Sequence, residues 1–425
     1  MRTLAIVLSV FCGVCLFVGC KPKTIVVEPV QAPDYERQLP PGQLALRKLN
    51  DPNDIPDFTV ASDNVSALKS AIEHSLEYLA KPSSRQHFPY GEITHEHAVA
   101  SLQAFAALLD ARLSASQLAR EIRERFDVYI SVGWDDKGTV LFTGYYTPIF
   151  DASRTRTPKF RYPLYRPPPN LVKAPDGNVL GVRGPDGQVA PLPDRRTIET
   201  RNLYAGNEMV WLSDPFEVYI AQVQGSVRLR MPDEQLTTIG YSASNGHDYQ
   251  SIGKELVKDG KIAANELSLA VMIRYFKAHP EDVRPYTWRN PRFVFFTETG
   301  DAPRGSLNEP VTPFRSIATD KSIFPRGCLV LISTELPRRN ESGIEMRKYQ
   351  GFALDQDTGG AIRAPGRCDV YMGIGDFAGE LAGRTLREGR LYYLFLKPAM
   401  MTPSAVLPMT TPNPAPRRTS GPAGP

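Results

Sequence analysis

The chain begins with a short apolar run. Residues Leu4 to Val18 carry no charge and follow Arg2. This run is shorter than the roughly 20 apolar residues of a membrane-spanning helix, and a positive start before a short apolar core is typical of a secretory signal. We therefore expect residues 1–20 to be an export signal rather than a membrane span.

Helical periodicity opens the body of the chain. Apolar residues recur at helical spacing over 68–79 and stop at Pro82, and a second helix is expected near 97–109. Ser114 and Gln117 have the spacing of a capping box, which predicts the start of a third helix. The first part of the body is therefore predicted to be helical.

Strand patterns dominate after this helical part. Short runs rich in β-branched and aromatic residues alternate with segments rich in Pro and Gly, and long loops are expected over 158–200. Two helices are expected near 251–257 and 265–277. The predicted strands cover residues 128–130, 140–142, 218–220, 292–297, 328–332 and 391–396. These patterns predict a β-rich α+β fold.

Composition sets the limits of this body. The proline-rich segments 21–64 and 402–425 show little periodicity and are expected to be a tether and a disordered tail. Residues 65–401 remain as a folded body that is long enough for two hydrophobic cores. Hydrophobic residues at 42 % and charged residues at 23 % exclude wholesale disorder, collagen, coiled-coil and polytopic membrane proteins. A net charge of +4 is too balanced for a nucleic-acid-binding protein.

The positions of the cysteines are consistent with an exported protein. Cys20 follows Gly19 at the end of the apolar run, which resembles the lipobox of bacterial lipoproteins, where the cysteine becomes the acylated N-terminus. Lys21 follows, with no Asp at the next position, and by resemblance to the bacterial sorting rule this favours the outer membrane over the inner membrane. The alternatives are an ordinary cleaved signal and an uncleaved anchor. Only Cys328 and Cys368 remain in the body, where they either form a disulfide or stay as two separate buried thiols.

Signals for metals and cofactors are absent from the sequence. The six histidines lack zinc spacing, and His95-Glu96-His97 is too close for the zinc helix motif. The chain contains no phosphate-binding loop and no nucleophile elbow. We therefore expect neither a metal nor a cofactor.

The densest group of reactive side chains lies between residues 353 and 371. Asp355, Asp357 and Asp369 stand there among glycines and apolar residues. Glycines allow a ligand to approach the backbone, and apolar surroundings raise the pKa of a carboxyl group, as a general acid requires. The alternative is a loop of capping aspartates.

Three further segments offer polar groups to a ligand. Tyr145 and Tyr146 are adjacent on a predicted strand, so one is expected in the core while the other presents its ring and hydroxyl to a sugar. The alternative is a strand end with two core aromatics. Residues 222–226 and 240–246 are small and polar, and Lys254 follows on a predicted helix.

Taken in order along the chain, these segments resemble the membrane-bound lytic murein transglycosylase A family. The matching segments are 142–148, 223–228, 239–256, 290–296, 312–320, 357–362 and 369–375. The C-terminal part resembles the three-aspartate domain, whose named positions correspond to Asp320, Asp357 and Asp369. The resemblance covers residues from about 85 to 400.

This resemblance implies two domains with a substrate groove between them. A double-psi β-barrel domain would comprise residues 65–147 and 285–401, with the three-aspartate region at about 305–400, and residues 148–284 would form a smaller inserted β-domain. The implied reaction cleaves the β-1,4 bond between N-acetylmuramic acid and N-acetylglucosamine in peptidoglycan. No water is added, so a 1,6-anhydromuramic acid end forms.

The resemblance also implies roles for single residues. Asp369 is expected to act as acid and then base, supported by Asp357, with Asp320 in a structural role. The residues expected to bind the glycan are Thr143, Tyr145, Tyr146, Thr147, Gln224, Gly225, Ser226, Tyr241, Lys254, Gly359, Gly360 and Ala361. The chain has one more residue between Asp357 and Asp369 than the family pattern.

The expected partners are peptidoglycan glycan strands and, through the lipid on Cys20 alone, a membrane. We expect a monomer at the periplasmic face of the outer membrane, alone or in cell-wall enzyme complexes, without nucleic acid. One alternative is a non-catalytic, wall-binding lipoprotein. Another is an aspartic peptidase, because Asp357-Thr358-Gly359 is the short signature of that class, although a single copy would require a symmetric dimer.

Overall fold

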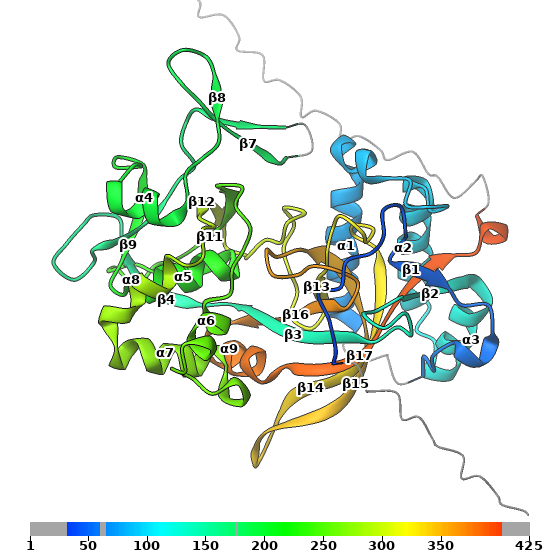
Figure 1. Cartoon of the computed structure of the whole chain (residues 1–425). Coiled ribbons are helices and arrows are strands. Elements are labelled where there is room, and N and C mark those ends of the chain that lie inside the picture. Colours follow the sequence, from blue (N-terminus) through cyan, green and yellow to red (C-terminus); the bar gives the residue numbers. More distant parts are fainter. Residues whose placement is uncertain (1–31, 60–64, 175–176, 402–425) are drawn as a thin grey trace, which may run out of the picture. The chain divides into compact units, whose positions relative to one another are not determined.

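The computed structural model describes residues 32–59, 65–174 and 177–401 (Figure 1). The predicted export signal with Cys20, residues 21–31 and 60–64 of the expected tether, and the whole of the expected tail lie outside these residues. Within the described ranges, no helix is long and apolar enough to cross a bilayer.

The described part of the expected tether packs onto the body. β1 (Leu46–Lys48) pairs antiparallel with β2 (Phe126–Ser131). Ala45 and Phe58 are fully buried, and the ring of Tyr35 lies edge-on to Trp134 with centroids 6.1 Å apart. The structure therefore differs from the expected tether over 34–59, because buried apolar and aromatic side chains fix this segment in place.

Three helices follow, as the periodicity predicts: α1 (Val65–Ala80), α2 (His95–Asp110) and α3 (Ala115–Arg125). The predicted capping box of Ser114 and Gln117 is present at the start of α3. Phe105 of α2 contacts Phe126 and Phe352, with centroids 5.9 and 4.8 Å apart. The helices therefore share one hydrophobic core with the strands.

The largest sheet closes on itself. Beside β1 and β2 it contains β3 (Val140–Thr147), β13 (Ser316–Ala318), β14 (Leu329–Asn340), β15 (Gly343–Asp357), β16 (Arg367–Ile374) and β17 (Leu386–Leu396). The strand order is β1-β2-β17-β14-β15-β13-β16-β3, and β17 also pairs with β3. The six strands from β17 to β3 therefore form a closed barrel, with β2 and β1 added at one edge of β17.

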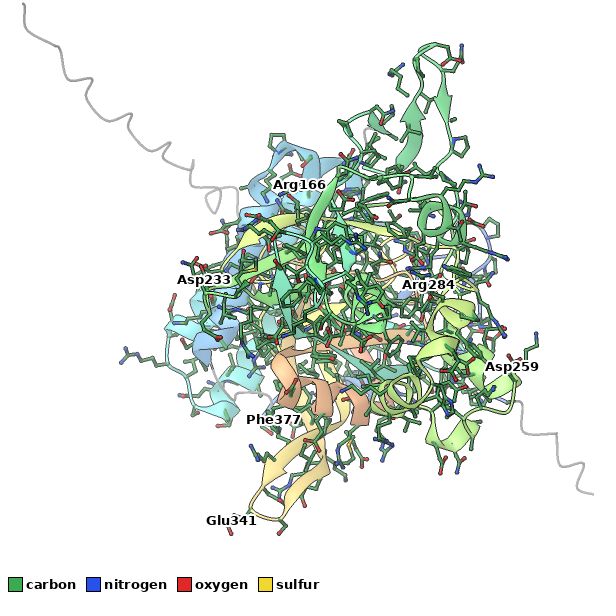
Figure 2. All side chains as sticks on the ribbon, turned by 90° about the vertical axis from the view of Figure 1, so that its left-hand side faces the viewer. Arg166, Asp233, Asp259, Arg284, Glu341 and Phe377 are labelled. Carbon is green, nitrogen blue, oxygen red and sulfur yellow. The ribbon has the colours of Figure 1, made fainter. Side chains whose placement is uncertain are left out.

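Two features extend from this barrel. Helix α9 (Gly375–Arg384) packs against β3 and β16. The paired ends of β14 and β15 form a hairpin that projects from the body, with Glu341 at its tip (Figure 2).

A second sheet is built entirely from the chain between β3 and β13. Its order is β12-β11-β10-β4-β9-β5. The strands are β4 (Ile149–Ser153), β5 (Tyr162–Tyr165), β9 (Glu208–Leu212), β10 (Ser226–Arg230), β11 (Leu236–Ser244) and β12 (Val294–Gly300). The expected insertion ends at residue 284, but β12 also belongs to this sheet because it pairs with β11.

Short elements complete this part of the chain. The helices are α4 (Arg195–Arg201), α5 (Pro215–Gln224), α6 (Ile252–Lys258), α7 (Leu269–Ala278) and α8 (Val283–Thr287). A three-stranded sheet comprises β6 (Leu171–Lys173), β7 (Val179–Arg183) and β8 (Val189–Ala190). Short 3-10 helices cover Pro52–Asp54, Pro82–His87, Ala264–Glu266, Pro280–Asp282 and Pro398–Met400. The expectation of long loops over 158–200 is therefore wrong where β5 to β8 and α4 form.

The strand predicted over 218–220 is also wrong, because these residues lie in α5. Asp214 caps the helix through the Phe216 N–H, Pro215 occupies its first turn, and Gly225 ends it with a φ of 76°. Val218, Tyr219 and Ile220 are all buried. A short apolar run in a buried helix cannot be told from a strand by its pattern alone.

Cys328 and Cys368 are free thiols and both are buried. Cys328 directly precedes β14 and Cys368 lies in β16, and β15 and β13 separate these strands in the barrel. Of the two expectations, the structure therefore has two separate buried thiols and no disulfide between Cys328 and Cys368.

Candidate active site

The barrel places Asp357 and Asp369 on either side of one short strand. Ala318 of β13 pairs with Asp357 at the end of β15 and with Asp369 in β16. Each step between strands is about 4.8 Å, so the Cα atoms of the two aspartates lie roughly 10 Å apart. A register shift between Ile317 and Ala318 interrupts the β13–β15 pairing here, and both carboxylates act on the pKa of Tyr145.

Asp369 continues this row to the next strand. Thr143 of β3 pairs with Asp369, and its hydroxyl donates a hydrogen bond to the carboxylate. The Arg367 guanidinium lies 3.6 Å from the same carboxylate oxygen and donates to the Thr143 hydroxyl at 3.3 Å. Arg367 stands two residues before Asp369, so both point to the same side of β16.

The surroundings of Asp369 act on its pKa in opposite directions. Burial raises the pKa above its ordinary value, while the positive charge of Arg367 and the hydrogen bond from Thr143 lower it. The side chain keeps 16 % of its surface exposed. Asp369 is therefore a carboxyl group that favours protonation yet has partners for its ionised form.

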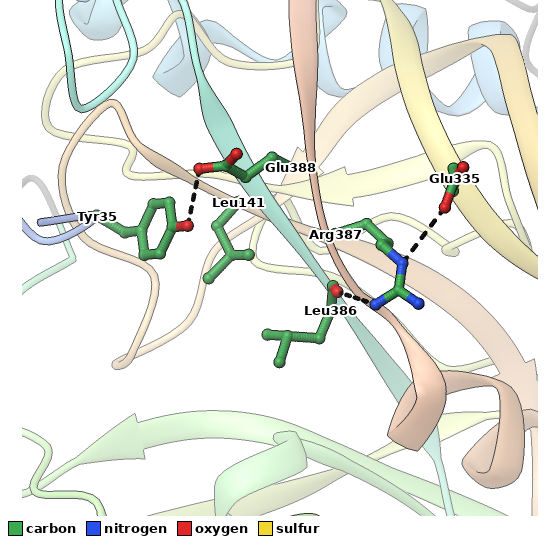
Figure 3. Close-up of a pocket in the computed structure, with 6 residues that line it drawn as sticks. All are labelled: Tyr35, Leu141, Glu335, Leu386, Arg387 and Glu388. Carbon is green, nitrogen blue, oxygen red and sulfur yellow. Dashed lines mark hydrogen bonds and ion pairs between the residues drawn. The ribbon is translucent and has the colours of Figure 1, made fainter. Parts of the chain in front are cut away.

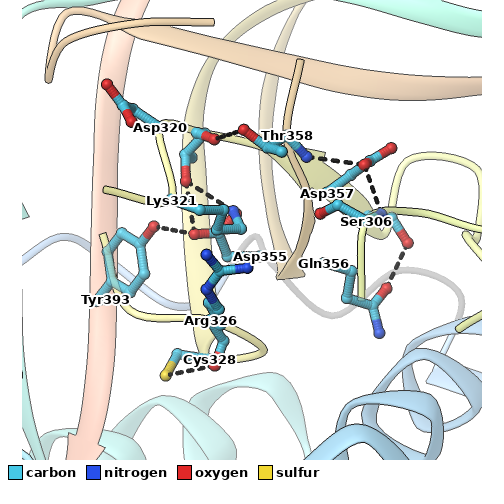
Figure 4. A network of polar contacts seen from close by, with 12 residues as sticks. Ser306, Asp320, Lys321, Arg326, Cys328, Asp355, Gln356, Asp357, Thr358 and Tyr393 are labelled. Carbon is cyan, nitrogen blue, oxygen red and sulfur yellow. Dashed lines mark hydrogen bonds and ion pairs between the residues drawn. The ribbon is translucent and has the colours of Figure 1, made fainter. Parts of the chain in front are cut away.

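Asp357 is held by backbone amides. Its Oδ1 accepts hydrogen bonds from the N–H groups of Ser306 and Thr358, both at 2.8 Å (Figure 4). Burial raises the pKa of Asp357, and these two amides oppose that rise. The carboxylate is therefore fixed in one orientation.

The two tyrosines of β3 differ in their surroundings. The Tyr145 ring lies 5.1 Å from that of Tyr371, and burial together with nearby Asp357 keeps the pKa of Tyr145 well above its usual range. Tyr146 is a core residue whose ring packs on Gly379 of α9. The Thr147 hydroxyl is buried against that of Tyr371 at 3.0 Å. Tyr145 is therefore near the aspartates, whereas Tyr146 and Thr147 are packed.

The second sheet reaches the barrel beside these tyrosines. The Gln224 side chain accepts the Tyr146 N–H at 3.2 Å. Gly225 provides the left-handed end of α5, and the Ser226 hydroxyl donates to the carbonyl of Arg304 at 3.4 Å. Residues 224–226 therefore join β3 to the second sheet.

Other expected binding residues lie in different settings. Tyr241 is 46 % exposed on β11. Gly360 packs against Tyr249, which precedes α6, and Arg292, which precedes β12. Its neighbours Gly359 and Ala361 belong to the same loop, between β15 and β16. The Lys254 ammonium forms an ion pair with Glu36 at 2.9 Å, so the segment before β1 reaches the inserted part of the chain.

Asp320 is buried and anchors two segments. Its Oδ1 accepts from the N–H and hydroxyl of Ser322 at 3.0 and 2.6 Å. Its Oδ2 accepts from the N–H of Ala364 at 3.0 Å. This carboxylate therefore ties the loop before β16 to the turn after β13.

A buried ion pair of Lys321 and Asp355 was missed by the sequence analysis (Figure 4). Asp355 also accepts hydrogen bonds from Thr319 and Tyr393, both at 2.7 Å. Burial lowers the pKa of Lys321, and the negative charge of Asp355 opposes that change. In the described part of the chain, no group of three potential ligands could hold a metal ion.

The cavity shown in Figure 3 lies elsewhere. It has a volume of about 640 Å³ and is lined by Tyr35, Leu141, Glu335, Leu386, Arg387 and Glu388. None of the expected catalytic or binding residues lines it, so it is not part of the candidate site.

Comparison with known families gives two matches. Residues 141–297 match the MltA specific insert domain, and residues 315–395 match the 3D domain. The insert match begins in β3 of the barrel and ends in β12, so it includes the second sheet up to Thr297.

Relatives and solved structures give the same result. Membrane-bound lytic murein transglycosylase A of Escherichia coli is 33 % identical over 64 % of this chain and 70 % of its own length, and that of Vibrio cholerae is 34 % identical over 62 % and 68 %. A membrane-bound lytic murein transglycosylase from Agrobacterium tumefaciens superposes with a TM-score of 0.69 at 27 % identity, covering 84 % of this chain and 98 % of that one. The Escherichia coli MltA structure with bound chitohexaose gives 0.62 at 27 % identity, covering 86 % and 97 %. The chain belongs to the membrane-bound lytic murein transglycosylase A family.

Proposed function

We propose that this protein is a peptidoglycan lytic transglycosylase in which Asp369 is the single acid and base. It would cleave the β-1,4 bond between N-acetylmuramic acid and N-acetylglucosamine. The observation that carries this proposal is the setting of Asp369, a largely buried carboxyl group with raised pKa beside Thr143 and Arg367. Chitohexaose in the Escherichia coli relative supports a β-1,4-linked amino-sugar polymer as substrate.

The reaction needs one carboxyl group because the nucleophile belongs to the substrate. Protonated Asp369 donates its proton to the leaving glycosidic oxygen as the bond from that oxygen to C1 of muramic acid breaks. The carboxylate then accepts the proton of the muramic 6-hydroxyl, whose oxygen bonds to C1. No water is consumed, and the intramolecular attack supplies the proximity that hydrolases obtain from a positioned water or a second carboxylate.

Neighbouring groups support both halves of this cycle. Arg367 and Thr143 stabilise the ionised form of Asp369 that exists between the two proton transfers. Asp357 is held by the amides of Ser306 and Thr358, and its proximity raises the pKa of Tyr145. We assign Asp357 to orientation rather than to proton transfer, because its oxygen already accepts two backbone hydrogen bonds.

We also propose the finer fold and the position of the glycan. The six-stranded ring would be a double-psi β-barrel, and the glycan would bind in a groove between the ring and the second sheet. Two contacts support this position: Tyr146 with Gln224, and Gly360 with Arg292. Both bring the two sheets together at segments that carry Tyr145 and Asp357.

The proposed location is the periplasmic face of the outer membrane, with a lipid on Cys20 as the only membrane contact. The names of the relatives describe them as membrane-bound, and Cys20 ends a lipobox-like segment. The partners would be glycan strands, bound by a monomer.

Substitution of the two aspartates tests the mechanism. Asp369→Asn keeps the shape of the side chain but cannot transfer a proton, so turnover should fall by at least about 10²–10⁴-fold while glycan binding persists. Asp357→Asn should slow turnover less. Initial rates on purified peptidoglycan and the affinity for glycan separate these effects. Normal turnover by Asp369→Asn would refute the assignment.

A further inference from the structure

Arginines surround the loop that joins β15 to β16. The Ile362 N–H donates to the carbonyl of Gly359 at 3.0 Å, which forms a turn, and Asp320 anchors Ala364. A Cβ on Gly360 would lie 3.2 Å from Nε of Arg292. Arg292, which precedes β12 in the chain, therefore lies against a loop that leads directly to Asp369.

The positive charges of Arg292 and Arg363 have no ion-pair partner among the described residues. Arg292 donates to the carbonyl of His247 at 3.2 Å, and Arg363 is exposed on the loop. Among the described residues, neither guanidinium has a carboxylate within 4.0 Å. Burial lowers the pKa of Arg292, and the positive charge of Arg363 lowers it further, while Tyr241 and, more weakly, Asp248 oppose this change.

Arg367 adds a third positive charge at the other end of the loop. Its only carboxylate neighbour within the described structure is Asp369, at 3.6 Å. Its Nε is buried and, among the described residues, has no hydrogen-bond acceptor. Like charges that lie close together repel, and an anion placed against them relieves this repulsion.

We propose that Arg292 and Arg363, with Arg367 beside Asp369, form a carboxylate-binding subsite for the substituent on the muramic acid at the cleaved bond. This inference rests on the proposed function. Muramic acid is the sugar whose C1 is attacked, and its 3-position carries a lactyl group that is either free or linked to a peptide. Both forms carry carboxylates close to the reacting ring, and the planar guanidinium group binds carboxylates through two parallel hydrogen bonds.

Three forms of one glycan test the subsite. The first carries its peptides, the second is stripped by an amidase and has free lactyl carboxylates, and the third has those carboxylates converted to a neutral methylamide. The measurement is kcat/KM for the formation of chain ends by the wild type, Arg363→Gln and Arg292→Gln. Arg120→Gln is the matched control, because Arg120 is an exposed arginine on α3.

The wild type and Arg120→Gln should use the neutral glycan roughly three- to tenfold less efficiently than a charged one. Arg363→Gln and Arg292→Gln should lose this difference, and high salt should reduce it in the wild type. A preference for the peptide-bearing form over the stripped form identifies peptide carboxylates as the ligand, and equal use of both identifies the lactyl carboxylate.

Equal use of all three glycans by the wild type would overturn the subsite, as would an unchanged preference in Arg363→Gln. The dissociation constants of the inactive Asp369→Asn variant for the same three glycans provide a readout that does not require turnover. Failure of the wild type to form anhydro ends would instead refute the proposed function, and the charge dependence of these dissociation constants would still decide the subsite.

Discussion

At the scale of single residues, the balance of forces on Asp369 decides how the site works. Burial raises its pKa, so the carboxyl group is available as an acid, and Arg367 limits this rise. Neither influence suffices alone, because the same group must release its proton and then accept one.

Replacing Arg367 by Gln should shift the pH dependence of the reaction. The substitution removes a positive charge that lowers the pKa of Asp369, so that pKa should rise further. The cycle begins with protonated Asp369, and kcat/KM therefore falls as the pH rises through this pKa. The fall should occur at higher pH in Arg367→Gln than in the wild type. Arg384→Gln, which removes an exposed arginine of α9, should leave the profile unchanged; a fall at equal or lower pH in Arg367→Gln would contradict this account.

The sequence was informative about some site residues and silent about others. Asp357 and Asp369 could be assigned because their spacing and glycine-rich setting match a known pattern. Arg367 was missed, although its position two residues before Asp369 on a predicted strand was a usable signal. Lys254 also pairs with Glu36, a contact between residues far apart in sequence that no local pattern reveals.

At the scale of elements, close packing of α9 on β3 holds the candidate site in shape. Gly144 stands between Thr143 and Tyr145, and a Cβ at this position would lie 2.7 Å from Cα of Ala382. The helix can lie this close to the strand only because Gly144 has no side chain.

Gly144→Ala should therefore destabilise the protein by about 1–3 kcal/mol, because the backbone of α9 must move. Gly383→Ala is the control, since a Cβ there meets nothing within 4 Å, and alanine in a helix should be neutral or stabilise by about 0.5 kcal/mol. Urea unfolding followed by circular dichroism measures both. Equal stabilities of Gly144→Ala and the wild type would show that α9 has room to move.

Element type was predictable where pattern and end signals agreed. The first three helices followed from periodicity and caps, whereas residues 218–220 were misassigned because a buried helix and a strand share the same apolar run. In that case the decisive signals were Asp214, Pro215 and Gly225, which bound α5 on both sides. These residues at the two ends therefore indicate a helix more clearly than the apolar residues between them do.

At the scale of the whole molecule, the barrel depends on pairings between distant segments. β3 pairs with β16 and β17, which lie more than 200 residues later in the chain. Such closure cannot be derived from local patterns, and the expectation of a barrel came only from the family resemblance. The part of the expected tether that packs through Phe58 and β1 was likewise invisible to composition.

The membrane attachment is a second property at this scale. Replacing Cys20 by Ala should remove the lipid and release the protein from membranes, because the roughly 15-residue apolar run is too short to span a bilayer. Fractionation of cells followed by immunoblotting measures the distribution, with Cys328→Ala as the control for loss of a cysteine. Membrane-bound Cys20→Ala protein that retains its first 20 residues would contradict lipid anchoring.

The most direct test of the central claim is the chemical form of the product. Purified peptidoglycan is digested with the wild-type protein in water enriched in oxygen-18, and the fragments are analysed by mass spectrometry. We predict muramic acid ends in the 1,6-anhydro form, lighter than hydrolytic ends by one water and free of the heavy isotope, because the attacking oxygen belongs to the sugar. Reducing ends that carry oxygen-18 would contradict this account and would indicate a hydrolase.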